Sequence, residues 1–162
     1  DTCDFWAVNV YTRQLINSRK EMFRFDRYEA SSIHCLDVPY FSDDICPEVI
    51  YHCLNRLKDK PVLITENGIA CKNDKYRIIY IAAVLQAVKQ AMDSGVKVLG
   101  YLHWSLLDNW EWGTYTPTFG LASVDHETYK RTLKPSGYFY GEIVENNALT
   151  LNVIKKYYSN NI

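Results

Sequence analysis

A single carboxylate, Glu66, follows the apolar run Val62-Leu63-Ile64 after one intervening residue, Thr65. An ionised carboxylate at the end of a buried strand needs hydrogen-bond donors or a nearby cation to be stable. A catalytic carboxylate in a cleft fits that position, and so does a structural Glu that caps a helix or forms a salt bridge. The position alone leaves both interpretations open.

Three tryptophans lie close together later in the chain: Trp104, Trp110 and Trp112. The same run holds polar residues that cannot all be buried without partners, namely Asp108, Asn109 and Glu111. Core packing is the usual role of such aromatic side chains, and these polar neighbours weaken that interpretation here. An indole face beside a carboxylate suits a pyranose, because the ring stacks on the sugar while the carboxylate accepts hydrogen bonds from two hydroxyls.

Three other polar side chains stand at the ends of apolar runs. Asn9 and Tyr11 end the first run, and His103 ends a later one. Considered alone, Asn9 and Tyr11 are typical of β-edge residues, and His103 is equally typical of a core histidine with satisfied nitrogens. Their position at strand ends keeps all three as candidate site residues.

Apolar periodicity predicts strands and helices that alternate along the chain. Short apolar runs predict strands at 5–10, 62–64 and 96–103, and we expect the first two to be buried. A period of 3.6 residues predicts helices at 47–57, 74–94 and 134–146. Residues 12–40 are expected to form a long loop, 119–124 a hairpin arm and 149–154 a short β-like stretch. The helical side chains expected to face inward include Lys89, Met92, Tyr138 and Val144.

This alternation implies parallel strands joined by right-handed crossovers. Three such units fit a doubly wound sheet or part of a (β/α) barrel, and the sequence contains no glycine-rich nucleotide-binding motif. In both folds the carboxyl ends of the strands meet at one edge, so we expect one concave site there. Its expected members are Tyr11, Glu66, Trp104 and Glu111. In a barrel, the side chains expected to face the interior are Phe5, Val8, Leu63, Val98 and Leu102.

The composition is that of a globular protein with one domain, which we expect to span residues 1–162. Hydrophobic residues make up 48% of the chain and the formal net charge is −1, which favours neither nucleic acid nor an anionic membrane as a partner. Five cysteines without metal-type spacing favour thiols in a reducing compartment over disulfides or zinc. We therefore expect no metal and no cofactor. The sequence starts without Met or a signal segment, so localisation stays open apart from this preference for the cytoplasm.

Four blocks of the sequence, in the same order, resemble glycoside hydrolase family 1, the β-glucosidase and β-galactosidase family. Residues 64–68 are similar to its nucleophile motif, and residues 4–11 are similar to its sixth-strand motif. Residues 104–112 resemble its eighth-strand motif, and 119–136 resemble its C-terminal pattern. The resemblance covers residues 4 to about 147, and the shared order of the blocks makes it specific.

The resemblance implies the C-terminal portion, about three β/α units, of a (β/α)8 TIM barrel. It implies a retaining mechanism in which Glu66 is the nucleophile of a covalent glycosyl-enzyme and Tyr11 orients that nucleophile. It also implies a cis peptide bond after Trp104. The implied substrate-binding residues are Asn9, Trp104, Glu111, Trp112 and Phe119.

Glu111 narrows the implied substrate. Family members that act on 6-phosphosugars replace this residue with a small one, and a carboxylate repels a phosphate dianion at short range. The resemblance therefore implies unphosphorylated β-glycosides or oligosaccharides as substrates. It does not separate glucosides from galactosides or fucosides, and it fixes neither the aglycone nor the oligomeric state.

The family's acid/base motif, Asn-Glu-Pro, does not occur in these 162 residues. The implied partner is therefore a set of N-terminal barrel units in a longer parent chain, and the 162 residues alone are expected to be inactive. One alternative is a non-catalytic sugar-binding module or pseudoenzyme remnant. Another is a small α/β binding protein with accidental motifs. An Asn-Glu-Pro strand upstream of residue 1 would distinguish the enzyme from the non-catalytic module, and the four ordered blocks argue against accidental motifs.

Overall fold

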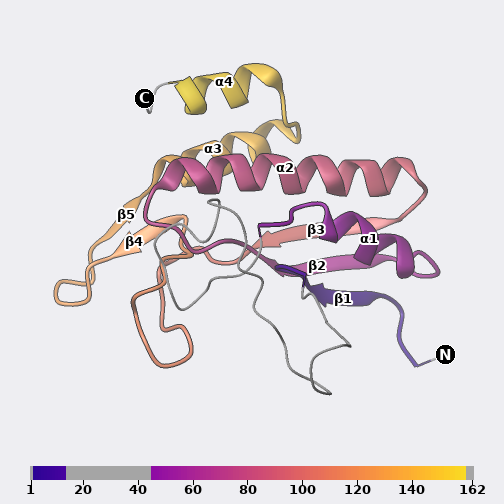
Figure 1. Cartoon of the computed structure of the whole chain (residues 1–162), viewed down its shortest axis with the longest axis horizontal. Helices are drawn as coiled ribbons and strands as arrows, with labels where there is room; N and C mark the ends of the chain where they lie inside the picture. The colour runs from indigo at the N-terminus through magenta and orange to yellow at the C-terminus, as the bar shows by residue number, and fades with distance from the viewer. Residues whose placement is uncertain (1, 14–44, 160–162) are drawn as a thin grey trace, which may run out of the picture.

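The computed structural model describes residues 2–13 and 45–159, so nearly all of the loop expected at 12–40 lies outside the described residues. The described chain forms a succession of strands and helices that ends in two consecutive helices (Figure 1). The strands are β1 (Trp6–Asn9), β2 (Val62–Asn67), β3 (Val98–His103), β4 (Ala122–Val124) and β5 (Arg131–Leu133). The helices are α1 (Val49–Arg56), α2 (Asp74–Asp93), α3 (Pro135–Asn146) and α4 (Leu151–Ser159).

The central element is a three-stranded parallel sheet with the order β1-β2-β3. The long helix α2 lies along one face of this sheet, and α3 and α4 stack beyond it (Figure 1). The predicted hairpin arm is confirmed, because β4 pairs antiparallel with β5. All three parallel strands run in the same direction, so their carboxyl ends meet at one edge.

The main core lies between the sheet and the helices α1 and α2. Val62 and Ile64 alternate along β2 and are fully buried, as the period of 2 requires for one face of a strand. Ile50 and Leu54 of α1 are also fully buried, four residues apart on one helix face. α1 begins at Val49 rather than at the predicted Pro47, which lies in the turn before the helix.

A second core joins α2, α3 and α4. Its buried members include Ile81 of α2, Phe139 of α3 and Val153 of α4. The β-like stretch expected at 149–154 is therefore wrong, because this segment enters a helix. Val153 and Tyr157, spaced four apart, pack on the second core, and the Thr150 hydroxyl accepts a hydrogen bond from the Val153 amide at the start of the helix.

The strand register corrects which side chains face away from the helices. Val8 and Val98 pair with Ile64 and Val62, so they lie on the helix-covered face and not toward a barrel interior. Leu63 pairs with Gly100 on the opposite face. The prediction that the first strand is buried is also wrong, because most of β1 is exposed at the edge of the described sheet.

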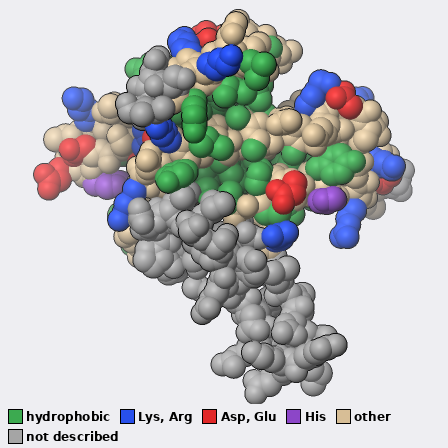
Figure 2. Space-filling view, turned by 45° about the horizontal axis from the view of Figure 1, so that its top comes forward, with side chains coloured by type: hydrophobic (Ala, Val, Ile, Leu, Met, Phe, Trp, Pro, Cys, Tyr) green, Lys and Arg blue, Asp and Glu red, His purple; other side chains and the backbone are tan. Residues whose placement is uncertain are grey.

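Four helical side chains expected to face inward are exposed: Lys89, Met92, Tyr138 and Val144. On helix α2 the inward-facing residue is Ala91 and not the predicted Met92, because residues 84, 88 and 91 follow the helical period of 3.6 residues. On α3 the inward positions are Phe139 and Ile143. Apolar side chains gather in the middle of the helical face, with charged ones at its margins (Figure 2).

In the described part of the chain, none of the helices has the length and apolar character that a membrane span requires.

Candidate active site

A pocket of about 720 Å³ opens at the carboxyl ends of the parallel strands. The seven site residues that the family resemblance implies all line it: Asn9, Tyr11, Glu66, Trp104, Glu111, Trp112 and Phe119. They come from the ends of β1, β2 and β3 and from the segment that follows β3. The expectation of one concave site at the strand ends is therefore met by the geometry.

Glu66 and Tyr11 meet across the ends of β2 and β1. The Tyr11 hydroxyl donates a hydrogen bond of 2.8 Å to Glu66 Oε2. Burial raises the pKa of Tyr11 far above its ordinary value, and the hydrogen bond to Glu66 and the charges of Glu66 and Glu111 raise it further. Tyr11 therefore remains a protonated donor at any physiological pH.

Glu111 and Trp104 form the second polar contact in the pocket. Trp104 Nε1 donates a hydrogen bond of 2.9 Å to Glu111 Oε1, and the peptide bond between Trp104 and Ser105 is cis. Burial raises the pKa of Glu111, the Trp104 hydrogen bond lowers it, and the nearby charge of Glu66 raises it again. The two carboxyl groups thus interact electrostatically within one pocket.

The remaining predicted residues divide into a floor and a rim. Phe119 is buried and its ring meets the Tyr11 ring edge-on, with centroids 6.3 Å apart. Asn9 Oδ1 accepts a hydrogen bond of 2.7 Å from the Thr65 hydroxyl, which fixes the amide beside β2. Trp112 is 83% exposed and has a positive φ of 46°, so it stands at the rim.

His103 does not line the pocket. Its Nδ1 lies 3.3 Å from the Tyr101 hydroxyl, within the protein interior. Burial lowers the pKa of His103 to about 3, and the positive charge of Arg77 contributes to the lowering. The structure supports the core position of this residue, but its nitrogens are not both satisfied, because Nε2 is buried without a hydrogen-bond partner among the described residues.

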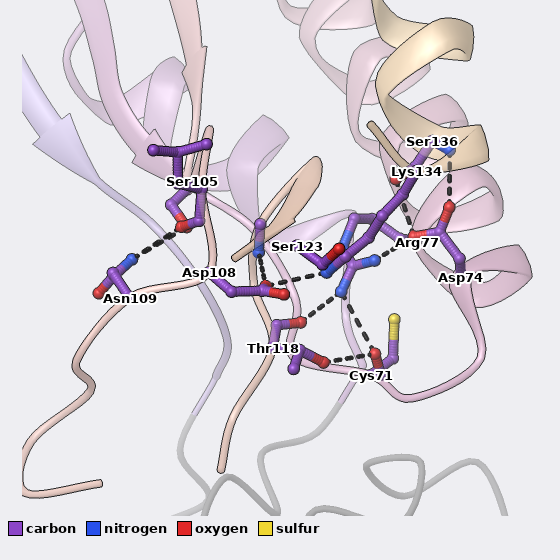
Figure 3. Close-up of polar contacts among 12 residues, drawn as sticks. Cys71, Asp74, Arg77, Ser105, Asp108, Asn109, Thr118, Ser123, Lys134 and Ser136 are labelled. Carbon is purple, nitrogen blue, oxygen red and sulfur yellow. Dashed lines mark hydrogen bonds and ion pairs between the residues drawn. The ribbon is translucent and has the colours of Figure 1, made fainter. Parts of the chain in front are cut away.

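Buried polar contacts hold the pocket-bearing loops against the helices (Figure 3). The Arg77 guanidinium, fully buried on α2, donates to the Asp74 carboxylate and to the backbone carbonyls of Cys71 and Thr118. Asp74 in turn accepts hydrogen bonds from the amide and hydroxyl of Ser136 on α3. Arg77 thereby ties the loop after β2 to the residue that precedes Phe119.

Gly68 allows the loop after β2 to pass close to Trp104. A Cβ at this position would lie 1.7 Å from the Trp104 carbonyl oxygen, so no other residue fits without a backbone shift. The close approach brings the segments that carry Glu66 and Trp104 together at the pocket.

The structure adds pocket residues that the sequence analysis did not identify: Thr12, Ile45, Gly68, Ile69, Ala70, Tyr80 and Trp110. Trp110 belongs to the aromatic run and could have been chosen on that ground. Tyr80 carries no such signal, because its spacing on α2 marks it only as a core position. No three His, Cys, Asp or Glu side chains among residues 2–13 and 45–159 are grouped so that they could hold a metal ion.

The chain belongs to glycosyl hydrolase family 1, whose sequence profile matches residues 1–149. It is 35% identical to β-glucosidase A of Thermotoga maritima, covering 90% of this chain and 35% of the relative. It is 34% identical to a β-galactosidase of Sulfolobus acidocaldarius, covering 90% of this chain and 32% of the relative. A β-glycosidase structure from Pyrococcus horikoshii matches with a TM-score of 0.81 at 35% identity, over 96% of this chain and 37% of that one.

These comparisons confirm the predicted fold class. The described strands and helices correspond to part of a family 1 TIM barrel, and the chain spans about a third of the length of the relatives compared above. Helix α4 (Leu151–Ser159) lies beyond the residues that the family profile matches.

Proposed function

We propose that this chain is the nucleophile-bearing C-terminal part of a retaining β-glycosidase that hydrolyses unphosphorylated β-glycosides. The observation that carries the proposal is the hydrogen bond from the Tyr11 hydroxyl to Glu66 inside the pocket. A carboxylate that attacks carbon has to be aimed at that atom, and a fixed phenol donor holds one of its oxygens in place. Membership of glycosyl hydrolase family 1 supports this choice of reaction.

In the proposed mechanism, Glu66 attacks the anomeric carbon and forms a covalent glycosyl-enzyme with inverted configuration. Water then attacks the same carbon from the other face, so the product regains the configuration of the substrate. A general acid must protonate the leaving oxygen, and we assign that group to barrel units outside residues 1–162. Residues 1–162 are thus one part of a single (β/α)8 domain.

We assign substrate binding to the side chains that share the pocket with Glu66. Trp104 offers its indole face to the sugar ring, while its Nε1 hydrogen bond holds Glu111. Glu111 accepts hydrogen bonds from sugar hydroxyls and disfavours a phosphate at that end of the ring. Asn9, Trp112 and Phe119 complete the wall around the sugar.

The experiment uses the whole protein, by which we mean residues 1–162 joined to the remaining units of the barrel. We expect Glu66→Gln to reduce hydrolysis of a nitrophenyl β-glucoside by several orders of magnitude, because the amide cannot form the glycosyl-enzyme. Glu145→Gln, on the exposed side of α3, is the matched control and should keep full activity.

A second experiment tests whether Glu66 is the nucleophile, and not only whether activity depends on it. In Glu66→Gly, azide can enter the space of the lost carboxylate and attack the anomeric carbon from the same face. We expect an α-glycosyl azide as the product, with the nitrophenolate as leaving group. Near-full activity of Glu66→Gln, or a β-glycosyl azide from Glu66→Gly, would assign the nucleophile to another residue.

A further inference from the structure

The exit of strand β1 is held by three successive hydrogen bonds to residues far away in the sequence. The Val10 amide donates to the Glu66 carbonyl at 3.0 Å, and the Val10 carbonyl accepts from Asn67 Nδ2 at 2.6 Å. The next carbonyl, that of Tyr11, accepts a hydrogen bond of 3.2 Å from the Tyr80 hydroxyl. The first two bonds fix Val10 to β2, and the third fixes Tyr11 itself to helix α2.

Tyr80 is well placed to hold that carbonyl still. Its side chain is only 4% exposed and packs in the main core against the sheet. Its oxygen also accepts a hydrogen bond of 3.0 Å from Asn67 Nδ2, and Asn67 Oδ1 accepts one of 2.8 Å from the Tyr101 hydroxyl. The Tyr80 hydroxyl is therefore oriented by an acceptor and a donor on either side.

We propose that Tyr80 is a positioning residue, which holds the backbone of Tyr11 so that the Tyr11 phenol stays aimed at Glu66. The inference rests on the proposed function, because alignment of Glu66 matters only if Glu66 reacts. Tyr80 sits on α2, which no motif of the active site includes, and it reaches Tyr11 across 69 residues of sequence. Burial raises the pKa of Tyr80 to about 12, which keeps its hydroxyl protonated as the donor to the Tyr11 carbonyl.

The first test is Tyr80→Phe in the whole protein, which removes one oxygen and keeps the ring. We expect kcat to fall about five- to tenfold, because loss of this one hydrogen bond leaves Tyr11 less well aimed at Glu66. KM should change by less than about twofold. Tyr140→Phe is the matched control, because the Tyr140 hydroxyl donates at 3.1 Å to the Tyr101 carbonyl and touches neither Tyr11 nor Glu66. A fall in kcat of the same size in both variants would overturn the proposal.

A double-mutant cycle separates positioning from a general loss of structure. If Tyr80 acts through Tyr11, adding Tyr80→Phe to Tyr11→Phe should lower kcat no further, because the phenol that it positions is gone. A structural role unconnected with Tyr11 would instead make the two losses multiply. Fully multiplied losses would overturn the proposal.

A crystal structure of Tyr80→Phe tests the inference without using activity. We expect the distance from Tyr11 Oη to Glu66 Oε2 to increase from 2.8 Å beyond hydrogen-bonding range, or the Tyr11 ring to take a second position. An unchanged single position of Tyr11 would overturn the inference even if the wild-type protein has no glycosidase activity. Failure of the proposed function would show differently, as absent turnover in wild type or full activity in Glu66→Gln.

Discussion

Trp104 Nε1 donates a hydrogen bond of 2.9 Å to Glu111 Oε1, although the two residues are seven positions apart in the sequence. The contact couples an indole ring to a carboxylate in the same pocket as Glu66. One oxygen of Glu111 is thereby held by the indole. The charge of Glu111 can therefore be removed by a substitution that keeps the size of its side chain.

The first prediction concerns that charge. Glu111→Gln in the whole protein keeps the size of the side chain and removes its repulsion of anions. We expect KM for a nitrophenyl β-glucoside to rise. The ratio of kcat/KM for this substrate to kcat/KM for its 6-phosphate should fall about tenfold, equivalent to about 1.4 kcal/mol. The measurement is kcat/KM for both substrates in wild type and variant. An unchanged ratio of the two values would place the sugar 6-position away from Glu111.

The second prediction concerns the ion pair behind the pocket. Lys134 Nζ lies 2.9 Å from Asp108 Oδ1, and the two side chains are only 16% and 10% exposed (Figure 3). Burial lowers the pKa of Lys134, while its bond to Asp108 raises it. We expect Asp108→Leu to destabilise the whole protein by about 3 kcal/mol, because it leaves a buried ammonium without its partner.

The matched control for Asp108 is Asp93, which pairs with Lys89 on the exposed surface of α2. Because both of those side chains are more than 60% exposed, Asp93→Leu should change stability by less than about 1 kcal/mol. The measurement is the free energy of unfolding in urea for both variants. Equal losses would contradict the distinction between the buried and the exposed pair.

The strand-end chemistry could be predicted because it depends on local sequence. A carboxylate after Val62-Leu63-Ile64 has to emerge at the carboxyl end of its strand, whatever surrounds it. The face on which Val8 and Val98 lie could not be predicted in this way, because it depends on irregularities in strand pairing. The register shifts between Val8 and Asn9 and between Val62 and Leu63, and each shift changes which side chains face the helices.

The supporting residues could not be predicted from the sequence for a related reason. Arg77 and Tyr80 lie on α2 at positions that a helical pattern identifies only as inward-facing. Their roles come from what they reach, such as the Thr118 and Tyr11 carbonyls, and those partners are 41 and 69 residues away. Residues 149–154 alone do not predict helix α4, because its helical structure depends on the second core that Val153 joins.

The third prediction concerns the pH dependence of stability at His103. Its pKa is lowered to about 3 in the folded protein, so between pH 6.5 and about 3 the unfolded chain binds a proton that the folded chain does not. Stability therefore falls as the pH falls through that window, by about 1.4 kcal/mol per pH unit from this group. We expect wild type to lose about 1.6 kcal/mol more than His103→Asn between pH 6.5 and pH 5, because the unfolded imidazole is already half protonated at pH 6.5.

Urea unfolding of wild type and His103→Asn at several pH values between 5 and 8 measures this difference. Other titrating groups contribute equally to both proteins, so the comparison isolates His103. Parallel stability curves for the two proteins would mean that His103 is protonated as easily in the folded state as in the unfolded one.

The fourth prediction concerns residues 1–162 on their own. The face of the sheet away from the helices carries Leu102, which is 53% exposed, and Phe5 and Leu99 are also exposed in the described chain. Both β1 and β3 have only one strand neighbour within the described sheet, so each leaves an open edge. Exposed apolar side chains beside open edges favour association over a rigid monomer.

We therefore expect the isolated chain to aggregate or self-associate, to bind hydrophobic dyes, and to have no measurable β-glucosidase activity. Glu66 would be present, but a missing general acid alone removes about 10²–10⁴-fold in rate, and a loosened sheet would not hold Tyr11 and Trp104 in place. The assay is the purified chain against a nitrophenyl β-glucoside, with sedimentation to report its assembly. Turnover by a monodisperse monomer, lost in Glu66→Gln, would contradict this prediction. It would make Glu111, the second carboxyl in the pocket and one whose pKa is raised, the first candidate for the general acid.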